Sequence, residues 1–169
     1  MPTDPRGDQP QLISALELEL RRTLSLDAVL AAVVGVVGER FTLCRVSLRV
    51  VVPEAAEVEI VAVWSRRRSG LTRGTRMPLR STTLAAVAAT GRPQIGSNVQ
   101  AADGLLHQLL GDEGIRSYAS APLGDVSSGA PVLSMSSSRP NGFTDADLSL
   151  VEAVSAVVAP HVKRLRGAA

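Results

Sequence analysis

Six arginines gather in a short stretch of the chain, and they are the residues whose type and spacing most suggest binding chemistry. They are Arg66, Arg67, Arg68, Arg73, Arg76 and Arg80. A guanidinium is always charged near neutral pH, and its forked donors match carboxylates and phosphates. Such a run is usually a solvated loop, whereas beside a cavity it would attract an anionic ligand. The sequence leaves both interpretations open.

Few other residues could ligate or react. His107 is the side chain best suited to ligate haem iron, whereas His161 stands beside cations where a terminal helix is predicted to end, a favourable place for a positive charge. Trp64 and Tyr118 either line a pocket or fill the core. Cys44 is the only cysteine, so neither an internal disulfide nor a pair of attacking and resolving thiols is available.

Several function classes are disfavoured by what the sequence lacks. No Gly-x-Ser-x-Gly elbow, His-Glu-x-x-His helix or phosphate-binding glycine-rich loop is present. The net charge is only +2, and four aromatic residues are too few to stack a single-stranded nucleic acid. We therefore expect a protein that is not an enzyme and that binds no nucleic acid.

The composition is that of a globular protein in a reducing compartment. Hydrophobic residues make up 45% and charged residues 20% of the 169 residues. The longest apolar run, residues 28–38, is far shorter than the ~20 residues that span a bilayer. The first ten residues do not resemble a signal peptide, and the single cysteine fits a cytoplasmic protein. We expect no membrane association.

Apolar periodicity predicts helices at both ends of one domain, residues 10–166, with a disordered lead at 1–9 and a tail at 167–169. The first helix covers about 12–24. A second, up to Arg40, has Ser25 as N-cap and Leu24 with Val29 as a hydrophobic staple. The last helix covers 145–166.

Between these helices the pattern changes to that of strands. Residues 43–52, 58–64, 118–123 and 131–138 are rich in β-branched or small residues, and short extended pieces are predicted at 77–79 and 92–95. Short helices are predicted at 82–90, capped by Ser81, and at 103–110. This order predicts an α+β fold with an antiparallel sheet covered by helices.

The stretch SSSRPNGFTDADLSL, residues 136–150, combines turn residues with the signature of a helix start. With Thr144 as N-cap, Asp147 completes a capping box, and Phe143 with Leu148 completes a hydrophobic staple. Local helix-start chemistry explains each of these residues, so we interpret the stretch as a structural joint in preference to a binding loop.

Three segments resemble the GAF domain family. They are TLAAVAATGRPQIGSNVQAAD (83–103), EGIRSYASAPL (113–123) and PVLSMSSSRPNGFTDADLSLVEAVSAVVAP (131–160). The family typically shows a Gly-Val/Ile-Arg-Ser strand leading into Pro-Leu, then Phe-Thr-x-x-Asp before a terminal helix. The resemblance extends over about residues 12–165. It implies a PAS-like fold, with about six antiparallel strands, terminal helices on one face and a ligand pocket on the other.

The resemblance also frames the candidate ligands. Bilin-binding members use a cysteine just before a histidine, but Leu106 precedes His107 here, so a covalent bilin is not expected. Members that bind cyclic nucleotides show an Asn-Lys-x-Phe-x-x-x-Asp-Glu pattern, which Asn141, Phe143 and Asp147 match only in part. Haem and a cyclic nucleotide stay as minor alternatives. The candidate ligand-binding residues are Trp64, Arg76, His107, Arg116 and Tyr118.

The function implied is that of a non-catalytic sensory or regulatory module in signal transduction. Binding of a small molecule would shift a conformational equilibrium that the terminal helices report. Those helices would form a homodimer, and any signalling effector would lie on another chain. The alternative is a protein–protein interaction module whose pocket is collapsed and whose function is dimerisation alone.

Overall fold

A single antiparallel sheet organises the molecule, as the α+β prediction requires. The computed structural model describes residues 8–99 and 110–167. The strand order is β3-β2-β1-β6-β5-β4, and every neighbouring pair is antiparallel. The strands are β1 (Leu43–Val52), β2 (Glu57–Ser65), β3 (Arg76–Pro78), β4 (Gln94–Gly96), β5 (Ser117–Pro122) and β6 (Val132–Ser137).

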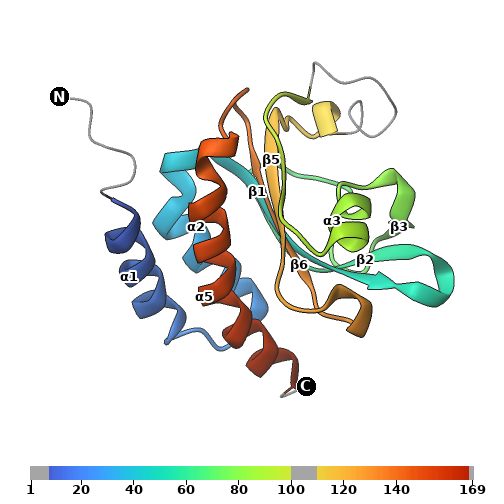
Figure 1. The fold of residues 1–169 in the computed structure, drawn as a ribbon, viewed down its shortest axis with the longest axis horizontal. Coiled ribbons are helices and arrows are strands. Elements are labelled where there is room, and N and C mark those ends of the chain that lie inside the picture. Colours follow the sequence, from blue (N-terminus) through green and yellow to red (C-terminus); the bar gives the residue numbers. More distant parts are fainter. Residues whose placement is uncertain (1–7, 100–109, 168–169) are drawn as a thin grey trace.

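Three long helices pack on one face of this sheet. They are α1 (Gln9–Leu20), α2 (Leu26–Phe41) and α5 (Leu148–Gly167), and Figure 1 shows them together on one side of β1, β5 and β6. The short helix α3 (Leu84–Thr90) lies on the other side, with β3 near it. Among the described residues, the second face of the sheet is covered by α3 and other short segments.

The helix ends follow capping chemistry, with three corrections. Ser25 Oγ accepts a hydrogen bond from Ala28 N at 3.1 Å, so the predicted N-cap of α2 is confirmed. The predicted staple of Leu24 with Val29 is wrong, because Leu24 is 87% exposed. The first helix also ends earlier than predicted, at Leu20 and not Leu24. Ser81 does not cap α3; Thr82 Oγ1 accepts from Leu84 N at 3.3 Å instead.

The joint before α5 is built largely as the sequence predicts. Thr144 and Asp147 form the capping box, with Thr144 N donating to Asp147 Oδ2 at 2.9 Å. Phe143 is fully buried and stacks on Phe41, with ring centroids 4.3 Å apart. The predicted staple partner, Leu148, is 37% exposed. Phe143 therefore anchors the start of α5 through an aromatic contact with α2 that the local pattern does not encode.

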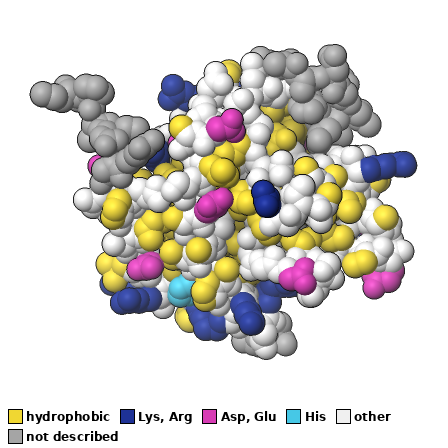
Figure 2. All heavy atoms as spheres, in the orientation of Figure 1, with side chains coloured by type: hydrophobic (Ala, Val, Ile, Leu, Met, Phe, Trp, Pro, Cys, Tyr) yellow, Lys and Arg dark blue, Asp and Glu magenta, His cyan; other side chains and the backbone are white. Residues whose placement is uncertain are grey.

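The main core lies between the sheet and the three long helices. Val46 and Leu48 of β1, and Leu133 and Met135 of β6, are fully buried there against side chains of α1, α2 and α5. A smaller apolar cluster around Val58, Leu84 and Val87 lies between the sheet and α3. On the side of the molecule that Figure 2 shows, charged side chains are interspersed with hydrophobic ones over the helical layer at the left.

Candidate functional site

The two faces of the central strands differ in chemistry because successive side chains of a strand point in opposite directions. On β1 the residues between the apolar core positions are Arg45, Ser47 and Arg49. On β6 the corresponding residues are Ser134 and Ser136. The face turned away from the long helices is thus unusually polar for a largely buried surface.

A cavity of about 400 Å³ lies against this polar face. Its floor carries the arginines and serines of β1, β5 and β6, and its apolar wall includes Ile60, Met77, Leu110 and Ile115. Residues of the segment that follows β3, Ser81, Thr82 and Thr83, close another side. The volume falls in the range of roughly 300–1,000 Å³ that is typical of small-molecule sites.

A β-bulge determines which residues of β2 reach the cavity. Leu48 pairs with Ala62 but Arg49 pairs with Ile60, so Val61 is an extra residue on β2. A bulge reverses the alternation of side chains along a strand. Ala62 and Trp64 therefore pack on the helical side, whereas Ile60 lines the cavity.

Arg49 is the centre of a hydrogen-bond network on the cavity floor. Its Nη2 donates to Ser134 Oγ at 2.6 Å and to Thr83 Oγ1 at 2.9 Å, and Ser120 Oγ lies 2.9 Å from Ser134 Oγ. Its Nε is buried and has no acceptor among the described residues. Burial, followed by repulsion from Arg45, lowers the pKa of Arg49 to about 9, so the guanidinium remains cationic at neutral pH.

Arg45 is the second cation of the floor and is only 8% exposed. Its Nη1 donates to Ser69 Oγ at 3.2 Å and its Nη2 to the Leu71 carbonyl at 2.7 Å. Burial lowers its pKa, and the carboxylate of Glu113 opposes that effect. Within residues 8–99 and 110–167, neither Arg45 nor Arg49 has a carboxylate oxygen within 4.0 Å; the ion pair found there joins Arg76 to Glu59 at 3.0 Å.

Tyr118 forms part of the wall because β4 has a glycine opposite it. Gly96 pairs with Tyr118, and the tyrosine ring occupies the place where a Cβ on Gly96 would lie. Burial raises the pKa of the Tyr118 phenol, and the charge of Arg49 opposes that shift. The phenol is therefore neutral at physiological pH and is available as a hydrogen-bond donor.

The structure brings together only some of the residues that the sequence suggested. Arg76 and Tyr118 line the cavity, and Arg76 is paired with Glu59. Trp64 packs on the helical side, and Arg116 is not among the residues that line the cavity. His107 lies outside the described residues. The other five arginines of the cluster do not line this cavity.

The cavity residues that sequence reasoning missed are Arg45 and Arg49. Their signal is a period of two, with Arg45, Ser47 and Arg49 alternating with the apolar residues of a strand otherwise rich in valine and leucine. Two arginines on one face of a central strand predict either a solvated face or a charged site. The denser arginine run after β2 is the more conspicuous pattern in the sequence, although most of it lies away from the cavity.

The residues that echo the cyclic-nucleotide pattern have structural roles. Asn141 has a left-handed backbone with φ 56°, Phe143 belongs to the main core and Asp147 completes the capping box. A Cβ on Gly142 would collide with Ser137 Oγ, which explains the glycine after Asn141. None of these residues lines the cavity. From Asn141 onward the stretch 136–150 thus has the role of a joint, whereas Ser136, at its start, lines the cavity.

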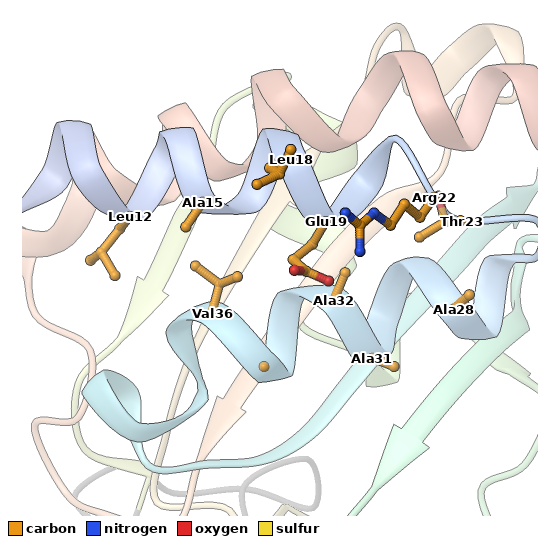
Figure 3. A pocket seen from close by; sticks show the side chains of 11 residues that line it. Leu12, Ala15, Leu18, Glu19, Arg22, Thr23, Ala28, Ala31, Ala32 and Val36 are labelled. Atoms are coloured by element: carbon orange, nitrogen blue, oxygen red, sulfur yellow. The ribbon is translucent and has the colours of Figure 1, made fainter.

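A second, shallower hollow lies on the outer side of the helical layer, between α1 and α2. Its walls are small and apolar residues of both helices, and Leu18 beside it is 53% exposed. Figure 3 shows Glu19 of α1 and Arg22, in the turn that follows α1, extending between the two helices above Ala31 and Ala32 of α2. This α1–α2 groove is a surface feature that faces away from the sheet.

Two further observations limit the chemistry available. Burial raises the pKa of the Cys44 thiol, which keeps it protonated and unreactive. Among the described residues no group of three or more His, Cys, Asp or Glu side chains is arranged to hold a metal ion. In the same part of the chain, no helix combines the length and apolarity needed to cross a bilayer.

Comparisons with known proteins agree with this architecture. A family model described as a GAF domain matches residues 23–162. A search of curated proteins found no match. Among solved structures, the free methionine-R-sulfoxide reductase from Neisseria meningitidis, in complex with its substrate, superposes with a TM-score of 0.73 at 18% identity, covering 100% of this chain and 96% of that one.

Two further solved structures show how widely this fold is shared. The GAF domain of a phosphoenolpyruvate-protein phosphotransferase from Coxiella burnetii gives a TM-score of 0.75 at 14% identity, covering 97% of this chain and 98% of that one. The phycoerythrobilin-bound GAF domain of a cyanobacterial phytochrome gives 0.67 at 14% identity, with 95% and 97% covered. At these identities the similarity establishes the fold alone.

Proposed function

Because the chain belongs to the GAF domain family, we propose that it is a sensory or regulatory module that binds a small molecule in the cavity on the polar face of its sheet. The observation that carries the proposal is the cavity itself, about 400 Å³ in volume and lined by buried polar side chains. A module used only for docking would gain nothing from polar groups buried around an empty space, since their burial costs free energy.

The route from the cavity to the rest of the protein runs through the sheet. Arg49 is on the cavity face of β1, and its neighbour Leu48 packs against the helical layer on the other face. A ligand that changes the position of β1 would therefore act on the packing of α1, α2 and α5. Any such effect is limited by the difference in ligand affinity between the two conformations.

The output surface in this proposal is a homodimer interface along the α1–α2 groove. The groove is apolar, Leu18 is exposed beside it, and it carries the opposite charges of Glu19 and Arg22. A two-fold axis would place Glu19 of each copy near Arg22 of the other, so the groove is complementary to itself. A signalling effector on another chain would bind differently to the dimer when the conformation of this interface changes.

The proposed module is not an enzyme. The reductase among the structural neighbours shares the fold, but attacking and resolving thiols are not available to a chain with one cysteine, and Cys44 is buried. The single buried thiol is also compatible with a reducing cytoplasm, where we place the protein in this proposal.

A ligand screen with a matched pair of variants tests the binding proposal. Ser136 is buried on the cavity wall and Ser97 is exposed at the end of β4. Nucleotides, haem and small organic acids, amides and amines are screened for a rise in melting temperature, which a specific ligand causes by mass action. Ser136→Phe should abolish every shift that Ser97→Phe retains. A complete absence of shifts with the wild-type chain would favour the docking module.

The dimer proposal is tested by the molar mass in solution. We expect a dimer at micromolar concentration and its dissociation by Leu18→Glu. Leu24→Glu is the matched control, because Leu24 is 87% exposed and does not line the α1–α2 groove. A monomer at all concentrations, or equal effects of the two variants, would rule out this interface.

A further inference from the structure

Neither arginine of the cavity floor has a carboxylate oxygen within 4.0 Å among the described residues. Arg45 is 8% exposed, and the Nε of Arg49 is inaccessible and has no acceptor among the described residues. The hydrogen-bond acceptors that both arginines use are neutral hydroxyl and carbonyl oxygens. Burying a cation without an anion is costly, and leaving one of its donors without an acceptor adds to the cost.

We infer that the cavity binds a small organic monoanion, in which a carboxylate group lies against Arg49 and an apolar body fills the rest of the space. This inference rests on the proposed function and specifies the ligand class of the same cavity. A carboxylate would supply the counter-charge that the floor lacks, and the planar fork of a guanidinium matches its two oxygens.

The hydroxyls around Arg49 fit the same ligand group. Ser120, Ser134 and Thr83 surround the guanidinium, and each hydroxyl can rotate to donate its hydrogen to an oxyanion. Without a ligand they are arranged as acceptors for Arg49 or as partners of one another. The floor therefore offers a cation and several neutral donors at one place, the combination that binds a carboxylate without a metal ion.

The other residues that line the cavity limit the total charge of the ligand and favour an apolar body. Asp112 and Glu113 also line the cavity, Asp112 is exposed, and Glu113 acts on Arg45. These two acids disfavour a second anionic group on their side. Ile60, Met77 and Ile115 add apolar surface to the lining of the cavity. A ligand with one negative charge at Arg49 and an apolar body elsewhere is complementary to all of these lining residues.

The test compares matched acids and amides on the full chain. Benzoate is compared with benzamide and hexanoate with hexanamide, and inorganic phosphate is the anion without an apolar body. Binding is measured by calorimetry at millimolar ligand and by the NMR resonance of the Arg49 Nε–H group. We expect each acid to bind about tenfold or more tightly than its amide, because hydrogen bonds to charged groups are the stronger ones. The Arg49 resonance should shift with the acids.

Three variants separate the role of Arg49 from a general effect of charge. Arg49→Gln should reduce the affinity for benzoate and hexanoate by about 10- to 100-fold. Arg49→Lys should lose less, because it retains the charge but not the fork. Arg80→Gln removes an exposed arginine that does not line the cavity and should leave the affinity unchanged. Circular dichroism of each variant verifies folding.

Each outcome bears on one of the two proposals. Amides that bind as tightly as the acids would overturn the monoanion and leave the binding function standing. Phosphate binding as tight as that of benzoate would overturn the requirement for an apolar body. If no acid binds while a neutral compound of the wider screen does, the monoanion is overturned again. If neither this set nor the wider screen yields any ligand, the binding function falls as well.

Discussion

The two faces of the central sheet use the same three strands for opposite purposes. Toward the helices, β1, β5 and β6 present residues such as Leu48, Ala119 and Met135, all essentially inaccessible to solvent and packed against three helices. Toward the cavity, the same strands present Arg49, Ser120 and similar polar residues around an open volume. One face is built for stability, because it removes apolar surface from water. The other retains polar groups at a cost in stability, as binding sites commonly do.

This comparison shows why two residues that are adjacent in the sequence can have different roles. Leu48 and Arg49 are neighbours in the chain, yet one belongs to the core and the other to the candidate site. Successive side chains of a strand point to opposite faces of the sheet, so the side chains of these two residues lie on opposite sides of it. Substitutions at adjacent positions therefore give the sharpest tests of the difference.

The largest effect is expected on the helical face. Leu48→Ala removes a fully buried side chain and should lower the free energy of unfolding by about 2–5 kcal/mol. Ser47→Ala, one position earlier on the cavity face, should change it by less than about 1 kcal/mol. Urea unfolding measures both. Equal costs for the two variants would show that the cavity face is packed as tightly as the core.

A second test concerns the contact that shapes the cavity wall. Gly96→Ala would place a methyl group where the Tyr118 ring lies, with the ring Cζ only 2.6 Å from the new atom. Overpacking of this kind should cost about 1–3 kcal/mol. Gly35→Ala is the control, because a Cβ at Gly35 has nothing within 4 Å and alanine is the better helix residue, so it should stabilise α2 by about 0.5–1 kcal/mol.

The Gly96 effect should depend on Tyr118. In a Tyr118→Ala background the methyl group meets no ring, so the cost of Gly96→Ala should largely disappear. A double-mutant cycle in urea measures this coupling. If Gly96→Ala costs the same in both backgrounds, the ring does not occupy the space above β4, and the wall of the cavity is described incorrectly.

The sequence predicted the fold more completely than the site. The apolar periods of α2 and α5, the caps at Ser25 and Thr144, and the β-branched runs of β1 and β2 are local signals, and the elements follow them. The cavity depends on relations that no local pattern contains. The bulge at Val61 turns Trp64 toward the helices, and the stacking of Phe143 on Phe41 joins residues about a hundred positions apart.

The arginines illustrate the same limit. Their number after β2 suggested a binding region, but clustering in sequence says nothing about burial. The strand period placed Arg45 and Arg49 on one face, and only the packing of β5, β6 and the segment before α3 shows that this face is enclosed. A charged residue becomes informative when it is buried, because burial is what makes an unpaired charge expensive.

A substitution at Arg49 should change stability by less than the substitutions above, and should raise it where they lower it. Arg49→Met replaces a cation whose burial is costly with an apolar side chain of similar length, so the ligand-free melting temperature should stay unchanged or rise by about 2–4 °C per kcal/mol gained. Differential scanning calorimetry measures it. A fall of many degrees would show that the guanidinium stabilises the ligand-free protein, and the contrast between the two faces would be lost.

The pH dependence of stability gives an independent test of the same charge. The pKa of Arg49 is lowered by burial to about 9, so the unfolded chain binds more protons than the folded one as the pH increases above that value. Stability from this group should therefore rise as the pH increases above about 9. The pKa of Tyr118 is raised, which acts in the opposite direction. The comparison is thus made between Tyr118→Phe and Tyr118→Phe with Arg49→Met. Stability should rise more with pH in the former, because Arg45, whose pKa burial also lowers, is present in both.

The smallest effect is expected at a residue on neither face. Asp125 caps the turn between β5 and β6, where its Oδ1 accepts from Ser127 N at 3.0 Å and its Oδ2 accepts from Ser128 Oγ at 2.8 Å. The hydroxyls of Ser127 and Ser128 lower the pKa of Asp125 below 3.8. The ionised form is favoured in the folded state, so its stabilising effect is present above pH 3.8 and is lost as the pH falls through the lowered pKa.

Asp125→Ala should therefore lower the urea midpoint slightly at pH 6. At pH values below the lowered pKa it should have no effect, because the wild-type carboxyl is then protonated and has already lost its stabilising charge. Leu48→Ala is the control. Its loss of stability involves no titratable group, so it should persist at both pH values. If the Asp125→Ala difference also persists in acid, the turn is held by its backbone geometry and not by the carboxylate.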